Sequence, residues 1–237
     1  MNKIEKLYEG KAKIVYSTED PELVIQFFKD DATAFDGVKK GQISGKGVAN
    51  NLISCHLFDM LEKNGIATHF VKRLSDNEML VRRVVIIPIE LVVRNVAAGS
   101  LCKRYGIPEG EVFPEPIVER YYKNDAFHDP LMDDDHIIRF KLANAAELTF
   151  LKTTAMRINQ ILQDFFNSIG ITLVDFKLEF GHYKDRLLLA DEISPDTCRF
   201  WEKGTRRKLD KDRFRFDLGD VESAYVEMLK RITGSSS

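Results

Sequence analysis

The segment LVDFKLEFGHYKDRLLLADEISPD, residues 173–196, carries charged side chains at a regular spacing. Asp175, Lys177 and Glu179 occupy every second position, and apolar residues separate them. Because successive side chains of a strand point to opposite faces, the three charged groups share one face of a predicted strand. One interpretation of this face is a solvated outer surface, and the other is the polar floor of a binding cleft.

A turn and a second apolar segment follow, so the sequence predicts a hairpin. If the turn is centred near Asp185, Glu179 and Asp191 lie opposite each other on one face, with Cβ atoms ~4.5–5.5 Å apart. Two carboxylates at that separation repel each other unless a cation lies between them. One interpretation is a Mg²⁺ site shared with nucleotide phosphates. The alternative is that both carboxylates face water and pair with Arg186 or Lys184.

Glycine and lysine residues near the N-terminus predict a phosphate site. The segment YEGKAKIVY places Gly10 and Ala12 between two strands, with Lys11 and Lys13 beside them. Backbone N–H groups of a tight glycine turn can approach a phosphate closely, and ammonium groups offset its charge. The segment is not a Walker A loop, and it is closer to the strand–glycine turn–strand lid over ATP in kinase-like folds. An ordinary hairpin with solvated lysines is the alternative.

A second predicted anion site begins at Arg94, at the end of an apolar strand. Gly99 and Ser100 then begin a short helix, and an arginine beside a helix N-terminus suits an anion. Arg199, which follows the carboxylate strand, can reach the same place. Among the remaining carboxylates, Asp36 in the turn sequence AFDG has the strongest claim to face a cleft.

The elements expected around these residues are strands in blocks with helices between them, which predicts an α+β fold. Pro88 interrupts a long apolar segment, so two strands are expected to meet there, and the boundary between an N-terminal β-rich lobe (1–87) and a C-terminal α/β lobe (88–237) is placed beside it. The expected strands are 4–9, 12–17, 23–28, 68–74, 78–87 and 89–95. The expected helices are 45–64, 100–105, 144–168 and 218–232.

Composition excludes several classes of function. The 237 residues include 35 Lys and Arg against 37 Asp and Glu. The chain has no excess of basic residues, so its composition does not predict binding to nucleic acid or to an anionic membrane. The three cysteines lack C-x-x-C spacing, which predicts a reducing compartment rather than a disulfide framework. No apolar signal or membrane-length segment is present, so we expect a cytoplasmic protein. The sequence contains neither an H-E-x-x-H motif, which would predict a histidine metal site, nor a G-x-S-x-G motif, which would predict a hydrolase.

Seven motifs, in order between about residues 5 and 230, together resemble the SAICAR synthetase family of purine-pathway ligases. They are YEGKAKIVY, GKGVANN, VVRNVAAGSL, KNDAFHDP, VDFKLEFG, DEISPDTCRFW and DKDRFR. The resemblance implies a kinase-like N-terminal antiparallel lobe, a larger α/β lobe, ATP in the cleft between them and Mg²⁺ as cofactor. The implied reaction joins the carboxylate of CAIR (carboxyaminoimidazole ribonucleotide) to the amino group of L-aspartate, giving SAICAR, ADP and phosphate.

The resemblance also implies roles for individual residues. Those implied for ATP are Gly10, Lys11, Ala12, Lys13 and Val15, with Arg82 and Val84 beside the adenine. Those implied for Mg²⁺ are Glu179 and Asp191, with Lys177 near the reacting carboxylate. Those implied for the substrates are Arg94, Ser100 and Arg199 at the ribotide phosphate, Asp175 at the ribose, and Asp36, Lys123 and Asp129 along the substrate side.

Two other classes of function stay open from the sequence. A small-molecule kinase on the same scaffold would share the glycine turn and the metal carboxylates, but the H-R-D motif that supplies a kinase base is missing. A non-enzymatic nucleotide-binding module would bind ATP without releasing ADP. A homodimer is also left open.

Overall fold

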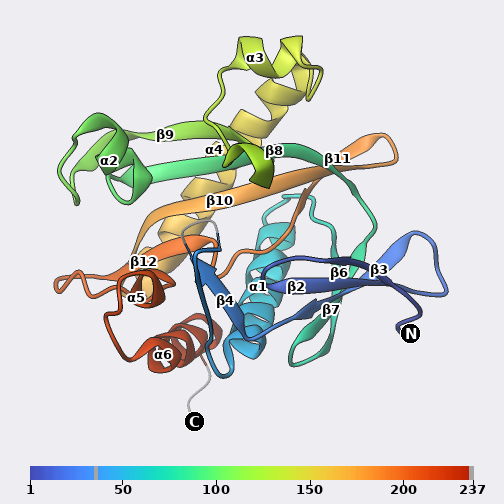
Figure 1. Cartoon of the computed structure of the whole chain (residues 1–237), viewed down its shortest axis with the longest axis horizontal. Helices are drawn as coiled ribbons and strands as arrows, with labels where there is room; N and C mark the ends of the chain where they lie inside the picture. Colours follow the sequence, from blue (N-terminus) through green and yellow to red (C-terminus); the bar gives the residue numbers. More distant parts are fainter. Residues whose placement is uncertain (35–36, 235–237) are drawn as a thin grey trace.

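The structure is a computed structural model that describes residues 1–34 and 37–234. Its first sheet is antiparallel and holds the N-terminal strands in the order β1-β2-β3-β7-β6 (Figure 1). These strands are β1 (Lys6–Glu9), β2 (Lys13–Ser17), β3 (Leu23–Phe28), β6 (Phe70–Ser75) and β7 (Glu78–Arg82). A separate two-stranded ribbon, β4 (Asp31–Ala34) with β5 (Lys39–Gln42), follows β3.

The second sheet holds the strand that carries the alternating charges. Its order is β11-β10-β8-β9, and β12 also pairs with β10. The strands are β8 (Val85–Val96), β9 (Val112–Tyr122), β10 (Ile171–Tyr183), β11 (Arg186–Ala190) and β12 (Cys198–Glu202). Because β10 pairs with three neighbours, both of its edges are hydrogen-bonded. Residues 173–176 and 178–181 of the strand are buried.

Helices cover the two sheets. The helices are α1 (Lys46–Lys63), α2 (Ser100–Tyr105), α3 (Asp134–Arg139), α4 (Ala145–Ser168), α5 (Asp212–Arg215) and α6 (Val221–Thr233), with a short 3₁₀ turn at Asp125–Phe127. Helix α4 packs against β10 and β8, and α1 packs against α6 (Figure 1). Within the described residues, no helix has both the length and the apolar character that crossing a membrane requires.

A capping box at the N-terminus of α4 explains why the observed bounds are close to the predicted 144–168. Asn144 accepts a hydrogen bond from the Glu147 N–H, and the Glu147 carboxylate accepts one from the Asn144 N–H. This capping box satisfies two N–H groups that a helix start leaves without partners. The apolar stripe that follows, including Leu151, Ile158 and Leu162, is buried in the main core.

The expected strand break at Pro88 is wrong. Strand β7 ends at Arg82 and β8 runs through Pro88 without interruption. Glu90 pairs with Glu179, whereas Ile86 pairs with Gly181, so β8 has extra residues at this point. A bulge of this kind accommodates proline, which has no N–H for the ladder. The sheets therefore change at residues 83–84, and the division into lobes at 1–87 and 88–237 stays a prediction.

Candidate active site

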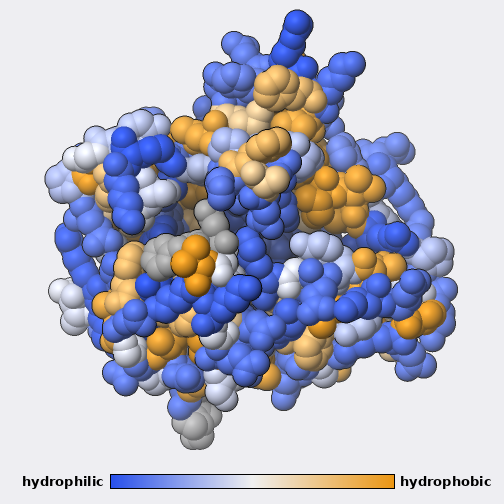
Figure 2. Space-filling model, in the orientation of Figure 1, coloured by the Kyte–Doolittle hydropathy of each residue, from blue (hydrophilic) through white to orange (hydrophobic). Residues whose placement is uncertain are grey.

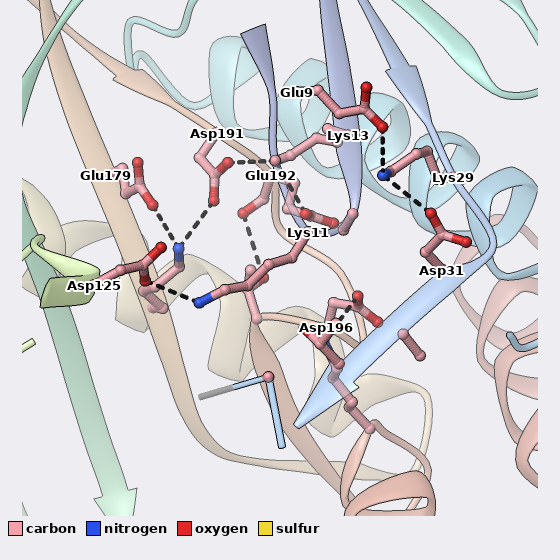
Figure 3. Close-up of a pocket in the computed structure, with 18 of the residues that line it drawn as sticks. Glu9, Lys11, Lys13, Lys29, Asp31, Asp125, Glu179, Asp191, Glu192 and Asp196 are labelled. Carbon is pink, nitrogen blue, oxygen red and sulfur yellow. Dashed lines mark hydrogen bonds and ion pairs between the residues drawn. The ribbon is translucent and has the colours of Figure 1, made fainter. Parts of the chain in front are cut away.

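A cavity of about 880 Å³ is lined by residues of both sheets. Its walls come from the β1–β2 turn, the β4–β5 ribbon, the loop at 123–129, strand β10 and the segment 191–197 (Figure 3). Lysines and carboxylates converge on it from these separate segments. In Figure 2, the face of the molecule that carries β4 is largely hydrophilic.

The largest charge cluster in the cavity surrounds Lys13 and Lys177. The Lys13 ammonium pairs with Asp191 and lies 3.0 Å from Glu192 Oε1. Lys177 Nζ lies 2.5 Å from Glu179 Oε1 and 3.2 Å from Asp191 Oδ2. One ammonium therefore contacts both carboxylates that the sequence predicted as a metal pair.

Two further residues complete this cluster. Lys177 Nζ also donates to Glu90 Oε1 on β8, at 3.1 Å. Lys123, from the loop after β9, pairs with the second oxygen of Glu179. Glu179 is only 2% exposed, so its charge depends on these two cations.

The charges of the cluster are fixed by one another. Burial works to lower the pKa of Lys13, but Asp191 and Glu192 outweigh it and hold that pKa well above its ordinary value. Burial works to raise the pKa of Asp191, but Lys13 and Lys177 hold that pKa well below its usual range. At neutral pH the ammonium groups are protonated and Asp191 is ionised.

The predicted pairing of Glu179 with Asp191 across the hairpin is wrong by one residue. Glu179 pairs with Ala190, and Asp191 lies just beyond the end of β11 with a φ of 64°. This left-handed conformation turns the chain and lets Asp191 reach both lysines. The solvated alternative is also wrong, because Glu179 is buried and Lys184 pairs with Glu22 instead.

A smaller cavity of about 160 Å³ adjoins the first one. Lys177, Asp196 and Thr197 line both cavities. Arg94, Arg199 and Arg215 line the smaller cavity together with Asp175. Two cavities that share Lys177 can hold two ligands whose reacting ends meet at that ammonium.

Arg94 is held by four acceptors at the end of β8. Its guanidinium donates to Asp175 Oδ2 at 2.7 Å, to Ser100 Oγ at 3.3 Å, to the Tyr121 hydroxyl at 3.4 Å and to Glu119. The side chain is buried, so its charge and its orientation are both fixed.

Arg199 approaches the same carboxylate from β12. Its guanidinium contacts both oxygens of Asp175, at 3.1 and 2.8 Å, and Nε donates to Asp212 Oδ2 at 2.8 Å. Asp212 also accepts from Arg215 at 2.6 Å. Arg94, Arg199 and Arg215 thus share three buried carboxylates, those of Asp175, Asp212 and Glu119, which fixes the orientation of the guanidinium groups.

Comparison with known proteins identifies the family. The SAICAR synthetase family model matches residues 6–232. The chain belongs to the SAICAR synthetase family. A phosphoribosylaminoimidazole-succinocarboxamide synthase of Chloroherpeton thalassium is 56% identical over 235 residues, which cover 99% of this chain and 100% of that protein.

Solved structures of SAICAR synthetases agree with the fold. The crystal structure of the Ehrlichia chaffeensis synthase aligns with a TM-score of 0.96 and 47% identity, covering 98% of this chain and 100% of that one. A SAICAR synthetase in complex with ADP aligns with a TM-score of 0.94 and 50% identity, covering 97% and 98%. The α+β fold predicted from the sequence is confirmed.

The activity of this SAICAR synthetase is the ATP-dependent ligation of CAIR to L-aspartate in purine biosynthesis. It is an amide-forming ligase, as the sequence predicted. The small-molecule kinase that the sequence left open is not favoured by these relatives.

Most residues that the sequence singled out line one of the two cavities of the synthetase. The larger cavity is lined by Gly10, Lys11, Ala12, Lys13, Lys123, Asp129, Lys177, Glu179 and Asp191. The smaller one is lined by Arg94, Asp175, Lys177 and Arg199. Ser100 contacts Arg94, while Val15, Arg82 and Val84 line neither cavity. Asp36 lies outside the described residues.

Sequence reasoning missed several charged residues of the site. They are Glu90, Glu192, Asp196, Lys211 and Arg215. Most of them lie in two motifs that carried the family resemblance, DEISPDTCRFW and DKDRFR. Those motifs were the available signal, but the side chains within them could not be ranked without knowing which ones face the cavity.

Proposed function

We propose that the larger cavity holds ATP and the smaller one holds CAIR, with the reacting groups meeting at Lys177. The observation that carries this proposal is that Lys177 lines both cavities. A protonated ammonium at that place offsets negative charge on the γ-phosphate and on the carboxylate that approaches it. The two anions would otherwise repel each other.

The phosphates of ATP are assigned to the β1–β2 turn. Gly10, Lys11, Ala12 and Lys13 line the larger cavity there. Gly10 N–H bonds to the Lys13 carbonyl at 2.8 Å, which closes the turn. The adenine is assigned to the neighbourhood of Val15, Arg82 and Val84. These three residues do not line the larger cavity itself.

The ribotide is assigned to the smaller cavity, where its phosphate meets the arginines. Arg94, Ser100 and Arg199 take its phosphate, because guanidinium groups match phosphate oxygens in geometry and charge. Asp175 accepts hydrogen bonds from the ribose hydroxyls. Arg215 lines the same cavity and adds a third guanidinium.

Mg²⁺ is assigned to Glu179 and Asp191. The described residues contain no group of three His, Cys, Asp or Glu side chains that could hold a metal ion. Mg²⁺ in nucleotide sites usually has only one or two protein carboxylates as ligands, and substrate phosphates supply others. Both carboxylates contact the Lys177 ammonium, so they lie within reach of one cation and the donor set fits. When bound, the metal supplies positive charge to the transferring phosphoryl group.

L-Aspartate is assigned to the open side of the larger cavity. Lys211 lines that cavity and shares Asp196 Oδ2 with the buried Lys46, at 3.3 and 3.0 Å. Two ammonium groups on one carboxylate leave a positive charge that an aspartate carboxylate can offset. Lys123 and Asp129 are assigned to the same side.

The residues suit a reaction in two steps. A carboxylate is a poor electrophile towards an amine, and phosphorylation gives it a good leaving group. The CAIR carboxylate oxygen attacks the γ-phosphorus and ADP leaves, which forms an acyl phosphate. The aspartate amine then attacks the acyl carbon, phosphate leaves, and the amine loses a proton.

The proposal also places the protein in the cytoplasm, as a homodimer. Free cysteines Cys55, Cys102 and Cys198 suit a reducing compartment. Exposed hydrophobic side chains, including Ile138 and Phe140, offer contact area for a second subunit. Light scattering of the purified chain tests the dimer.

An ADP-release assay tests the proposed function. Steady-state ADP release should require ATP, CAIR and L-aspartate together, and SAICAR should appear in equal amount. Omitting either CAIR or aspartate should reduce the steady-state rate to background. Sustained ADP release without aspartate, with a phosphorylated ribotide as product, would show a kinase instead.

A further inference from the structure

Glu192 occupies a different position from the carboxylates assigned above. It follows Asp191 directly, and both side chains contact the Lys13 ammonium. Successive residues of a strand point to opposite faces, so two neighbours reach one partner only where the strand is broken. The φ of 64° at Asp191 supplies that break.

The second oxygen of Glu192 is held inside the protein. Ser194 Oγ donates to Glu192 Oε2 at 2.6 Å, and the same Ser194 oxygen accepts from the Asp196 N–H at 3.1 Å. Ser194 is 0% exposed and Glu192 is 4% exposed. Glu192 therefore has one carboxylate oxygen fixed by the loop and the other directed at Lys13.

Asp191 has no comparable anchor in the hydrogen bonds described for it. Its two oxygens contact the ammonium groups of Lys13 and Lys177, and it is assigned to the metal as well. Because Asp191 is shared among Lys13, Lys177 and the metal, it cannot by itself fix the direction of the Lys13 ammonium. Glu192 can, because its partners are Lys13 on one side and the loop on the other.

We propose that Glu192 is the positioning residue for Lys13, and that Ser194 fixes Glu192 in turn. This inference rests on the assignment of Lys13 to the ATP phosphates. An ammonium has three N–H donors, so Lys13 can keep both carboxylates and still donate to a phosphate oxygen. Glu192 sets the direction of that third donor.

The variant Glu192→Gln removes the charge and retains the length. A glutamine can still bond Ser194, but it loses the negative charge that pairs with Lys13. Loss of one charge-assisted hydrogen bond should weaken ADP binding about tenfold. Calorimetric titration with ADP in EDTA measures this without metal and without turnover. The KM for ATP should rise by a similar factor, while the KM values for CAIR and L-aspartate stay unchanged.

Two further variants separate positioning from charge. Ser194→Ala keeps the Glu192 charge but removes its anchor, and it should weaken metal-free ADP binding by a smaller factor in the same direction. Glu192→Asp keeps the charge on a shorter side chain, and it should recover part of the affinity that Glu192→Gln loses. Glu22→Gln is the matched control, because Glu22 pairs with Lys184 on an exposed surface and should bind ADP normally.

The outcomes distinguish this inference from the proposed function. If Lys13→Met weakens ADP binding and Glu192→Gln does not, Lys13 keeps its role and the positioning role of Glu192 is wrong. If Lys13→Met also leaves ADP binding unchanged, the phosphate assignment itself fails. Equal losses for ATP, CAIR and aspartate in Glu192→Gln, or normal binding in Ser194→Ala with a normal melting temperature, would also overturn the inference.

Discussion

Replacing Arg94 by lysine should damage CAIR binding much more than ATP binding. The guanidinium donates to Glu119, Asp175, Ser100 and Tyr121 at once. A lysine ammonium keeps the charge but has three donors at a single point and cannot reproduce the planar fork. Four of the five guanidinium N–H donors are used by these acceptors, and a lysine could not direct the remaining donor at a ribotide phosphate in the same way.

The expected size of the effect follows from the partners that remain. A hydrogen bond to a charged group contributes about 1.5–3 kcal/mol, which corresponds to an increase of about 10- to 150-fold in the KM for CAIR. The fold should survive. Glu119 still accepts from Arg104 at 2.5 Å and from the Tyr121 hydroxyl at 2.8 Å, and Asp175 still accepts from Arg199. No buried carboxylate is left without a cation.

Initial rates with one substrate varied at a time measure the KM for CAIR and for ATP. Arg104→Lys is the matched control, because Arg104 contacts the same Glu119 and Tyr121 but does not line the smaller cavity. The reasoning fails if Arg94→Lys raises both KM values alike. It also fails if Arg104→Lys has the same effect as Arg94→Lys.

Two other substitutions test separate parts of the site, and a third tests a buried histidine outside the two cavity linings. Asp191→Asn should reduce kcat by at least about 100-fold at a normal melting temperature, since it removes a carboxylate assigned to Mg²⁺; near-normal kcat at modest Mg²⁺ would refute the assignment. Lys211→Met should raise the KM for L-aspartate about tenfold and leave that for ATP unchanged; a rise for ATP alone would exclude the assigned role. Burial lowers the pKa of His69 to about 3, and neither ring nitrogen has a hydrogen-bond partner within the described residues. The unfolded chain therefore binds a proton below about pH 6.5 that the folded chain does not, and about 2 kcal/mol of unfolding free energy should be lost by pH 5. His69→Leu should remove that part of the pH dependence in urea titrations, and an unchanged dependence would contradict the argument.

The sequence predicted elements well where the signal is local. Helix α4 begins within one residue of its predicted start, at the capping pair Asn144 and Glu147. The alternation of Asp175, Lys177 and Glu179 marks one strand face. That face lines the cavities and the other packs into the core. Both patterns depend only on residues within a few positions of one another.

Errors arose where a proline was taken as the end of a strand. Pro88 lies in a bulge of β8, and Pro114 and Pro116 lie in β9, in a segment for which the sequence predicted no strand. Strand β9 is at the edge of its sheet, so one side of it has no neighbouring strand to which a missing N–H would matter. Edge position and bulges are properties of the assembled sheet and are not visible in a short segment.

The sequence predicted which types of residue form the site, but it did not predict which side chains contact one another. Tyr183 pairs with Arg186, so the hairpin turns at Lys184 and Asp185 and its register differs by one residue from the predicted one. Asp191 then lies beyond the strand in a left-handed conformation that no glycine marks. The pairing of Lys13 with Asp191 spans 178 residues, and that of Arg94 with Asp175 spans 81. Such contacts depend on how the two sheets meet, so residues such as Glu192 and Lys211 were missed.

The central claim is that the carboxylate of CAIR is phosphorylated by ATP before aspartate attacks it. The most direct test uses CAIR labelled with ¹⁸O in that carboxylate and mass analysis of the phosphate released with SAICAR. In the two-step reaction, the carboxylate oxygen that attacks the γ-phosphorus leaves with the phosphate. We expect one labelled oxygen in each released phosphate and one in the amide carbonyl of SAICAR. Phosphate that carries no label would contradict the mechanism and the meeting of the two substrates at Lys177.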